Sequence, residues 1–281
     1  MSYHPTLIDG APPSAQDLDW LLASRALAFG EGVFTSIRVW QGRAVFSEDH
    51  LQRLKAGLEV LQVGLPASFW QALEQEMTVQ AQQLDEGLLK IMLLAGPGGR
   101  GYKRSETAQG WHRVLRLLPM QVVQPAYQGI PCWWMPYPGK RPALAHKHLN
   151  RLTQVLASEF CPEPFQEALL FNDQGYAMEG IARNLFWYQQ GQWFTPALQT
   201  GALEGVLRKQ LLKQSPVTEL EEAGLATLQQ AEEVFLCNSV QGIWPVVELQ
   251  DASGVLARWP RGEATLELMQ QLHPALGLPT A

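Results

Sequence analysis

The 281-residue sequence lacks an excess of basic side chains, since its 21 lysines and arginines are outnumbered by 27 aspartates and glutamates. The resulting net charge of −6 leaves no broad surplus of cations to neutralise nucleic-acid phosphates. We therefore expect no nucleic-acid partner. Small anionic ligands remain compatible with this composition, because a few local arginines suffice to bind them.

Cysteine is scarce, and long apolar runs are missing. The three cysteines, Cys132, Cys161 and Cys237, are odd in number and share no close spacing, which argues against a disulfide framework and a zinc knuckle. None of the six histidines forms a His-x-x-x-His pair, so no catalytic metal is expected. The N-terminus has no basic start followed by an apolar stretch, and no run of apolar residues reaches membrane-spanning length. These absences predict a cytoplasmic protein without a membrane partner.

What the sequence does contain is the composition of a globular protein, with 46% hydrophobic and 17% charged residues. Strand-like alternation and helical periodicity follow one another along the chain. These patterns predict strands at 33–39, 43–46, 88–94, 114–118, 130–135, 167–171 and 233–237. They predict helices at 47–63, at 67–84, after Lys147, from about Gly205, and at 263–272. Ser47 is the expected N-cap of the first helix.

The order of these segments indicates a mixed α/β fold in two unequal parts. A stretch at 119–127, with Pro125 inside it, is typical of an extended linker. We therefore predict a smaller N-terminal α/β domain over 1–119, a linker over 120–127 and a larger C-terminal domain over 128–281. No Gly-x-Gly-x-x-Gly motif opens a β-α-β unit, so a dinucleotide-binding fold is not predicted.

Lys147 is the most informative residue, because it stands between two histidines just ahead of a helical pattern. Apolar residues then recur at helical spacing, at Leu149, Leu152, Leu156 and Phe160. We expect this stripe to pack on a core and to hold Lys147 near a buried scaffold, where the pKa of a lysine falls below its ordinary value. A neutral amine is the nucleophile that forms a Schiff base with an aldehyde such as that of pyridoxal phosphate. The competing interpretation, a solvated lysine at a helix start, holds for most lysines.

Glu179 and two loops are candidates for binding the rest of such a cofactor. In its apolar setting Glu179 needs a cationic partner, and a protonated pyridine nitrogen is one. The glycine-rich segment 201–208 leads into a helix whose first N–H groups form a phosphate seat. Asn238 and Ser239 supply short polar side chains at a second loop. An exposed strand-end acid and two ordinary turns are the alternatives.

Three arginines complete the set of candidates. Arg53 lies one step off the apolar stripe of its helix, from which it could reach inward to a phosphate. Arg100, between glycines, could clamp a carboxylate once its loop closes. Strand alternation places Thr35 on one face of its strand and Arg38 on the opposite face. Solvated helix arginines and flexible hairpin tips are the ordinary alternatives.

Six short motifs occur in an order that resembles the fold-type IV pyridoxal-phosphate enzymes, the group that includes branched-chain and D-amino-acid aminotransferases and 4-amino-4-deoxychorismate lyase. The motifs are Phe-Gly-Glu-Gly-Val-Phe-Thr-Ser at 29–36, His-Leu-Gln-Arg-Leu at 50–54, Gly-Gly-Arg-Gly-Tyr at 98–102, Lys-His-Leu-Asn-Arg-Leu at 147–152, Glu179 with Asn-Leu-Phe-Trp at 184–187, and Cys-Asn-Ser at 237–239. They span most of the chain and look most like those of the lyase. The resemblance implies a two-domain fold, pyridoxal 5'-phosphate in the interdomain cleft with the larger domain binding it, and a homodimer.

The resemblance also implies roles for individual residues. Lys147 would be the Schiff-base lysine and proton carrier, and Glu179 would face the pyridine nitrogen. The remaining cofactor contacts would come from Arg53, the backbone of Val206 and Leu207, Asn238 and Ser239. Thr35 would assist a second proton transfer, and the substrate carboxylates would be bound by Arg100 and, less strongly, Arg38. The implied reaction is that of an oxo-acid lyase, which converts 4-amino-4-deoxychorismate to 4-aminobenzoate and pyruvate in folate biosynthesis.

Two departures separate the chain from the transaminases of this group. Phe29 stands where they commonly have tyrosine, and Thr35-Ser36 stands where they have glutamate and glycine; both differences favour the lyase. Arg183 is larger and more basic than the residue expected near its loop, which leaves the carboxylate partners open. The first alternative is a fold-type IV aminotransferase acting on a small D- or branched-chain amino acid. The second is a silent ligand-binding or scaffolding protein, against which the joint presence of the lysine and the glutamate argues.

Overall fold

The computed structural model describes residues 6–99, 101–104, 110–120, 122–138 and 146–280. Its contacts divide the chain into two compact units, one formed by Met1–Gln121 with His146–Asn150 and the other by Val122–Ala145 with Arg151–Ala281. The segment His146–Asn150 thus belongs to the first unit, although the sequence pattern groups it with the C-terminal part. The mixed α/β fold class predicted from the sequence is confirmed.

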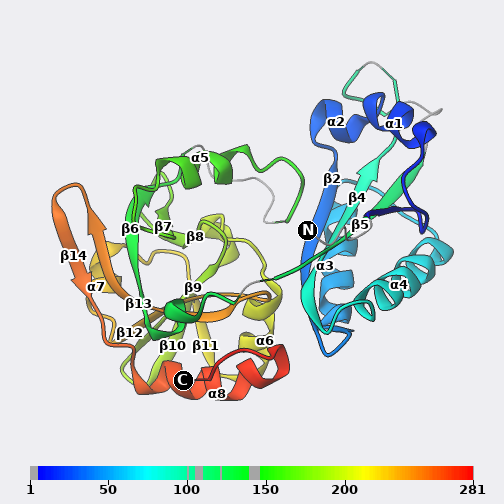
Figure 1. The fold of residues 1–281 in the computed structure, drawn as a ribbon. Coiled ribbons are helices and arrows are strands. Elements are labelled where there is room, and N and C mark those ends of the chain that lie inside the picture. The colour runs from blue at the N-terminus through cyan, green and yellow to red at the C-terminus, as the bar shows by residue number, and fades with distance from the viewer. Residues whose placement is uncertain (1–5, 100, 105–109, 121, 139–145, 281) are drawn as a thin grey trace. The chain divides into compact units, whose positions relative to one another are not determined.

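Among the described residues of the first unit, five strands form an antiparallel sheet in the order β1-β5-β4-β2-β3. The strands are β1 (Thr6–Ile8), β2 (Gly32–Trp40), β3 (Arg43–Ala44), β4 (Glu86–Ala95) and β5 (Trp111–Leu118). Two long helices, α3 (Ser47–Val60) and α4 (Ala67–Ala81), cover one face of this sheet (Figure 1). The alternation along β2 explains the packing, because Val33, Ile37 and Val39 are buried in one core with leucines of the two helices.

Helix α3 begins differently from the prediction. Phe46 is the N-cap, in a left-handed conformation with φ at 53°, and no side chain caps the helix. The predicted capping role of Ser47 is therefore wrong, since Ser47 is already the first helical residue. A hairpin turn joins β2 to β3, with positive φ at both Gln41 (49°) and Gly42 (69°), which suits a two-residue connection.

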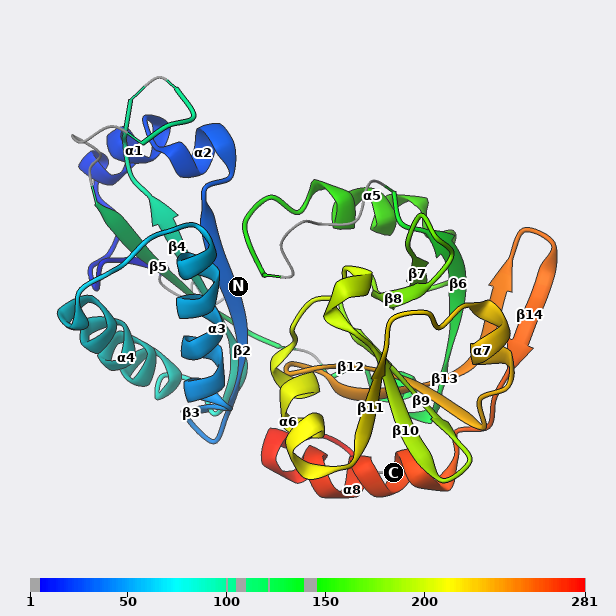
Figure 2. The same cartoon turned by 180° about the vertical axis from the view of Figure 1, so that it is seen from behind.

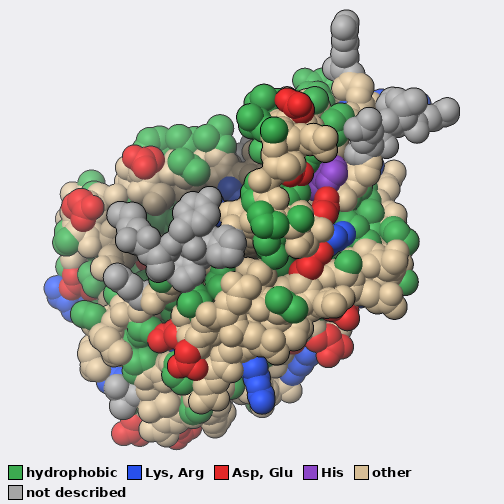
Figure 3. All heavy atoms as spheres, turned by 45° about the vertical axis from the view of Figure 1, so that its right-hand side comes forward, with side chains coloured by type: hydrophobic (Ala, Val, Ile, Leu, Met, Phe, Trp, Pro, Cys, Tyr) green, Lys and Arg blue, Asp and Glu red, His purple; other side chains and the backbone are tan. Residues whose placement is uncertain are grey.

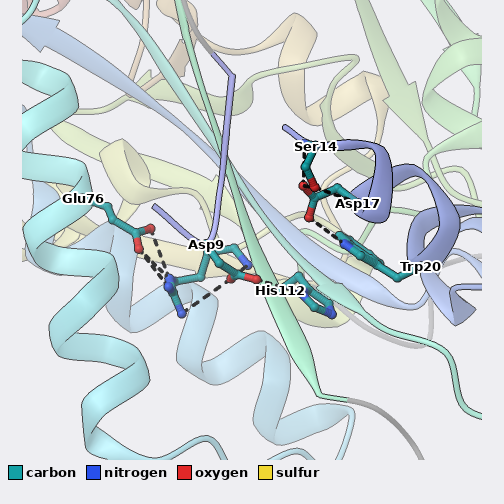
Figure 4. Close-up of polar contacts among 7 residues, drawn as sticks. Asp9, Ser14, Asp17, Trp20, Glu76 and His112 are labelled. Atoms are coloured by element: carbon teal, nitrogen blue, oxygen red, sulfur yellow. Dashed lines mark hydrogen bonds and ion pairs between the residues drawn. The ribbon is translucent and has the colours of Figure 1, made fainter. Parts of the chain in front are cut away.

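The first unit also contains two N-terminal helices that the sequence pattern does not indicate, α1 (Ala15–Leu22) and α2 (Arg25–Phe29). Polar and aromatic contacts attach this end of the chain to the sheet (Figure 4). Asp9 accepts a hydrogen bond from the N–H of Arg113 at 2.9 Å and lies 2.7 Å from Nδ1 of His112. Arg113 pairs with Glu76 at 2.8 Å, and the ring of Trp20 stacks on His112 with centroids 3.9 Å apart. The N-terminal segment is thereby fixed to β5, which is itself joined to α4 by the Arg113–Glu76 pair.

Residues 146–150 run beside strand β2. The N–H of Phe34 donates to the carbonyl of Lys147 at 2.9 Å, and the N–H of Leu149 donates to the carbonyl of Gly32 at 2.9 Å. The close approach requires glycine at position 32, since a Cβ there would lie 2.5 Å from a backbone oxygen of β4 and 2.6 Å from the Leu149 side chain. Lys147 is therefore held by backbone hydrogen bonds to a sheet strand and not by entry into a helix.

Among the described residues of the second unit, nine strands are paired, and six of them close a ring in the order β9-β12-β13-β6-β7-β8 and back to β9. The strands are β6 (Ile130–Pro136), β7 (Ala168–Phe171), β8 (Ala177–Gly180), β9 (Asn184–Gln189), β10 (Gln192–Pro196), β11 (Val217–Leu220), β12 (Glu233–Asn238), β13 (Gly242–Asp251) and β14 (Gly254–Arg258). The helices are α5 (Leu152–Phe160), α6 (Val206–Gln214), α7 (Leu225–Gln229) and α8 (Glu263–Leu276). Helix α6 packs against β12, and α8 packs against β12 and β13 (Figure 2).

Two predictions fail in the second unit. The apolar stripe of α5 does not pack on a core, because the side chains of Leu152 and Phe160 are 64% and 61% exposed, whereas Ala157 is buried. The stretch expected to be an extended linker contains a 3-10 helix at Gln124–Gln128. Tyr127 of this turn is fully buried, and its hydroxyl donates to a backbone carbonyl at 2.9 Å.

The surface carries mixed side chains. On the face drawn in Figure 3, acidic, basic and hydrophobic side chains are interspersed, and no broad basic area is visible there. None of the helices within the described ranges combines the length and the apolar character that crossing a membrane would need.

Candidate active site

Lys147 is fixed on the first unit with its side chain beside an aromatic ring of β2. Its Nζ lies 4.8 Å from the centroid of the Phe34 ring, and the Nζ of Lys90 lies 5.4 Å from the same centroid. An ammonium group over an aromatic face is attracted by the ring quadrupole. The backbone hydrogen bond to β2 and this ring contact together give the half-buried amine a defined place.

Thr35 lies on the face of β2 that packs on α3, where it contacts two residues of that helix. Its Oγ1 lies 2.6 Å from Nδ1 of His50, and Nη2 of Arg53 donates to the same oxygen. Arg53 thus reaches inward, as its position beside the apolar stripe predicts. Burial, and then the charges of Arg53 and Lys147, hold the pKa of His50 well below its ordinary value.

The two arginines predicted to bind substrate carboxylates differ in what the structure shows of them. Arg38 is fully buried and pairs with Glu86 at 2.6 Å, and its guanidinium carbon lies 5.8 Å from the centroid of Trp40. Arg100 lies outside the described residues. Both substrate roles stay predictions, and that of Arg38 has to accommodate a carboxylate already at its guanidinium.

Glu179 is held at the end of strand β8 in the second unit. The side chain is buried, and its Oε2 accepts hydrogen bonds from the N–H of Leu203 at 2.8 Å and from Nδ2 of Asn184 at 3.4 Å. Donors from two separate segments orient the carboxylate. A buried and oriented carboxylate is a suitable partner for a protonated ring nitrogen.

Asn184 connects that carboxylate to the start of helix α6. Its Nδ2 also donates to the carbonyl of Leu203 at 2.7 Å, and a Cβ at Gly205 would lie 1.9 Å from its Oδ1. Position 205 therefore accepts glycine alone without rearrangement. Val206 and Leu207 open the helix, and N–H groups of a first helical turn have no intrahelical acceptor. This turn can bind an anion such as a phosphate.

In the loop after β12, the side chain of Asn238 forms hydrogen bonds with the backbone of the same turn. The Oδ1 of Asn238 accepts from the N–H groups of Val240 at 3.0 Å and Gln241 at 2.8 Å, and its Nδ2 donates to the carbonyl of Ala182 at 3.3 Å. Ser239 is buried beside it. Asn238 thus shapes the loop, and the cofactor contacts of both residues stay predictions.

Arg183, whose size is unexpected for its loop, belongs to a buried ion pair. Its Nη1 contacts Glu167, and its guanidinium carbon lies 3.3 Å from the ring centroid of Trp244. Glu167 is 1% exposed and also accepts from the N–H of Ile181 at 2.8 Å. Burial raises the pKa of the Glu167 carboxyl, and Arg183 partly offsets that rise. The pair fastens the turn that follows Glu179.

Three residues of this arrangement are not among those singled out from the sequence. His50 lies three positions before Arg53 on one helix, a spacing that places both on the same face and so offers a usable signal. Asn184 is the first residue of the motif at 184–187, but an asparagine alone does not indicate a catalytic or binding role. Glu167 gives no signal, because its partner lies 16 residues away and on another segment.

Residues 32–249 match the family described as amino-transferase class IV. The chain belongs to this family. A similar protein is the aminodeoxychorismate lyase of Vibrio harveyi, which is 29% identical to this chain over 261 residues. The aligned region covers 90% of this chain and 95% of the Vibrio protein. The crystal structure of 4-amino-4-deoxychorismate lyase from Pseudomonas aeruginosa matches this chain with a TM-score of 0.83 at 31% sequence identity. The match covers 96% of this chain and 98% of the Pseudomonas chain. The structure of the T.th. branched-chain amino acid aminotransferase with pyridoxamine 5'-phosphate has the same fold, with a TM-score of 0.81 at 19% identity. The match covers 99% of this chain and 96% of the aminotransferase chain.

These similarities confirm the resemblance that the six motifs indicate. The two units have the architecture of a fold-type IV pyridoxal-phosphate enzyme, with an open sheet in one unit and a closed ring of strands in the other. The aminotransferase structure that shares this fold contains pyridoxamine 5'-phosphate.

Proposed function

We propose that this class IV protein is a pyridoxal-phosphate-dependent lyase that converts 4-amino-4-deoxychorismate to 4-aminobenzoate and pyruvate. The observation that carries the proposal is the near full-length similarity to two proteins named as that lyase, at 29% and 31% identity. Thr35 and Ser36, in place of the glutamate and glycine common in transaminases, support the same choice.

The described residues offer the three groups that pyridoxal 5'-phosphate needs. Lys147 provides an amine for the aldehyde, and the buried Glu179 provides a carboxylate for the ring nitrogen. The first turn of α6, at Val206 and Leu207, provides backbone N–H groups for the phosphate, and Gly205 before it leaves room for Asn184, which also contacts Glu179. The remaining proposed contacts to the phosphate end are those of Arg53, Asn238 and Ser239.

The proposed chemistry moves two protons and breaks one carbon–oxygen bond. When bound, pyridoxal phosphate withdraws electrons from the carbon that carries the substrate amine. Lys147 takes the proton from that carbon, and a proton is delivered to the methylene of the enolpyruvyl group while its ring carbon–oxygen bond breaks. The ring becomes aromatic and pyruvate leaves, so atoms balance without water. Thr35 is our candidate to assist the second proton transfer.

The substrate carries two carboxylates, for which we propose Arg100 and, as a weaker candidate, Arg38. Their assignment rests on residue type and position in the motifs. Holding both carboxylates would orient the amine-bearing carbon toward Lys147 and keep the leaving pyruvyl group near a proton donor.

We further propose that the protein acts as a homodimer. The support is the exposed apolar face of α5, where the side chains of Leu152, Val155 and Phe160 are 64%, 53% and 61% exposed. Clustered apolar side chains at a surface are typical of an interaction site. Sedimentation of the wild type and of Phe160→Lys checks this proposal, with a shift toward monomer expected for the variant.

The direct test mixes purified, cofactor-loaded protein with 4-amino-4-deoxychorismate and measures 4-aminobenzoate and pyruvate, which should appear in equal amounts. A parallel reaction with amino acids and a keto acid tests the aminotransferase alternative. Sustained amino transfer without 4-aminobenzoate would reject the lyase proposal in favour of that alternative. Absence of both activities would leave the silent binding protein.

A further inference from the structure

His50 is a fully buried histidine for which the proposed reaction has no use. It lies on α3, one helical turn before Arg53, and faces β2. Its Nδ1 lies 2.6 Å from Oγ1 of Thr35 and 3.4 Å from Nη2 of Arg53. His50 and Arg53 therefore both contact the hydroxyl oxygen of Thr35, and Thr35 and Arg53 are residues of the proposed site.

The hydrogen atoms at this junction can be counted. Arg53 is a donor only, so its Nη2 gives a hydrogen to Oγ1 of Thr35. Complete burial and the charges of Arg53 and Lys147 keep His50 neutral, with its pKa well below the ordinary value. A neutral imidazole carries one hydrogen, on Nδ1 or on Nε2, and the choice decides what Thr35 can do.

With the hydrogen on Nε2, Nδ1 accepts from the Thr35 hydroxyl. That hydroxyl is then fully used within the protein. The Nε2–H, however, is buried and has no hydrogen-bond partner among the described residues. A buried donor without an acceptor is among the rarest features of native proteins.

With the hydrogen on Nδ1, the imidazole donates to Oγ1 of Thr35. The two lone pairs of that oxygen are then filled by Arg53 and His50, and the hydroxyl keeps its own hydrogen. Each tautomer therefore leaves one buried donor without an acceptor in the described part of the chain, the Nε2–H of His50 in the first case and the Thr35 hydroxyl in the second. Because Arg53 is the proposed phosphate ligand, a bound cofactor or substrate would supply an acceptor next to it.

We propose that His50 is a positioning residue that, as the Nδ1–H tautomer, donates to Thr35 and so directs the threonine hydroxyl hydrogen toward the bound ligand. This inference deepens the proposed function and rests on it for the identity of the ligand. The role differs from simple core filling, because it depends on where one hydrogen sits.

Two substitutions of His50 by residues with a side-chain amide distinguish a positioning role from simple core filling. In His50→Asn the side-chain amide occupies the place of Nδ1 and can still donate to Thr35. In His50→Gln the same amide is one methylene farther out, near the place of Nε2. His50→Leu fills the space without any donor and controls for packing.

We expect His50→Leu and His50→Gln to lose about tenfold in kcat and in affinity for pyridoxal 5'-phosphate, the scale of one lost buried hydrogen bond. His50→Asn should stay within about twofold of the wild type in both measurements. In a Thr35→Val background the three substitutions should become equivalent, because the acceptor has gone. Equal losses for Asn and Gln, or equal effects in both backgrounds, would overturn the proposal.

The tautomer is measured directly by ¹⁵N NMR on cofactor-loaded wild-type protein labelled at histidine, with His50→Asn used to assign its signals. Protonated Nδ1 supports the inference and protonated Nε2 refutes it, whether or not any variant folds poorly. This readout and the cofactor affinity need no turnover. A protein that forms no 4-aminobenzoate yet shows the Nδ1–H tautomer and rescue by Asn would therefore refute the proposed reaction and leave the role of His50 intact.

Discussion

Replacing Arg183 by methionine should destabilise the protein strongly, because the Glu167 carboxylate would stay buried without its cation. Glu167 is 1% exposed and Arg183 is 9% exposed, so little water reaches either group. Removing one partner of a buried ion pair costs about 3–5 kcal/mol of the free energy of unfolding. For a chain of this size that corresponds to a fall in Tm of roughly 6–20 °C.

A matched control comes from an exposed pair of the same kind. The Nε of Arg258 lies 2.7 Å from Glu248, but the Arg258 side chain is 71% exposed. Arg258→Met should therefore cost at most about 1 kcal/mol. Calorimetry or intrinsic fluorescence on heating measures both variants. Adding Glu167→Leu to Arg183→Met should recover much of the loss, because the unpaired buried charge is then removed.

The loss in Arg183→Met should also depend on pH, with a sign set by Glu167. Burial raises the pKa of this carboxyl in the folded protein, and loss of Arg183 removes a contribution that lowers it. An acid with a raised folded pKa stabilises below its unfolded pKa, and this contribution is lost as pH rises through the folded pKa. The deficit should thus be larger at pH 8 than at pH 5. Equal Tm losses for Arg183→Met and Arg258→Met, or a deficit that grows on acidification, would refute the reasoning.

Three further outcomes are expected. Lys147→Ala should abolish turnover while pyridoxal 5'-phosphate still binds noncovalently; borohydride should label the wild type at Lys147, and label at another position would exclude this lysine. Glu179→Ala should lower kcat by about tenfold or more, since the ring nitrogen loses its carboxylate; an unchanged rate of proton abstraction, followed by solvent isotope exchange, would remove Glu179 from its role. Gly205→Ala places a Cβ 1.9 Å from Oδ1 of Asn184 and should weaken cofactor binding, measured by fluorescence titration, whereas Gly64→Ala, with nothing within 4 Å of the added Cβ, should not.

Segments with strong local patterns were predictable from the sequence. Strands β2 and β4 and helix α4 follow from alternation and helical spacing, because their buried faces contact one core formed within the first unit. The positions of Arg53 and of the first turn of α6 also follow from local rules, namely helix-face geometry and the exposed N–H groups of a helix start.

The failures have different physical causes, none of which a local sequence pattern contains. The stripe of α5 has core spacing, yet Leu152 and Phe160 are exposed. Lys147 is tied to β2 by pairing with residues more than a hundred positions earlier. Arg183 has a partner that no local pattern identifies.

The membership of His146–Asn150 in the first unit has a consequence for how the chain is made. The polypeptide passes from the first unit to the second, returns for these few residues and then leaves again. During synthesis the first unit cannot be finished when residue 121 leaves the ribosome, because its lysine-bearing segment emerges only after strand β6 of the second unit. A gene cut after residue 121 would encode a sheet that lacks its own lysine segment, so no contiguous fragment reproduces the first unit alone.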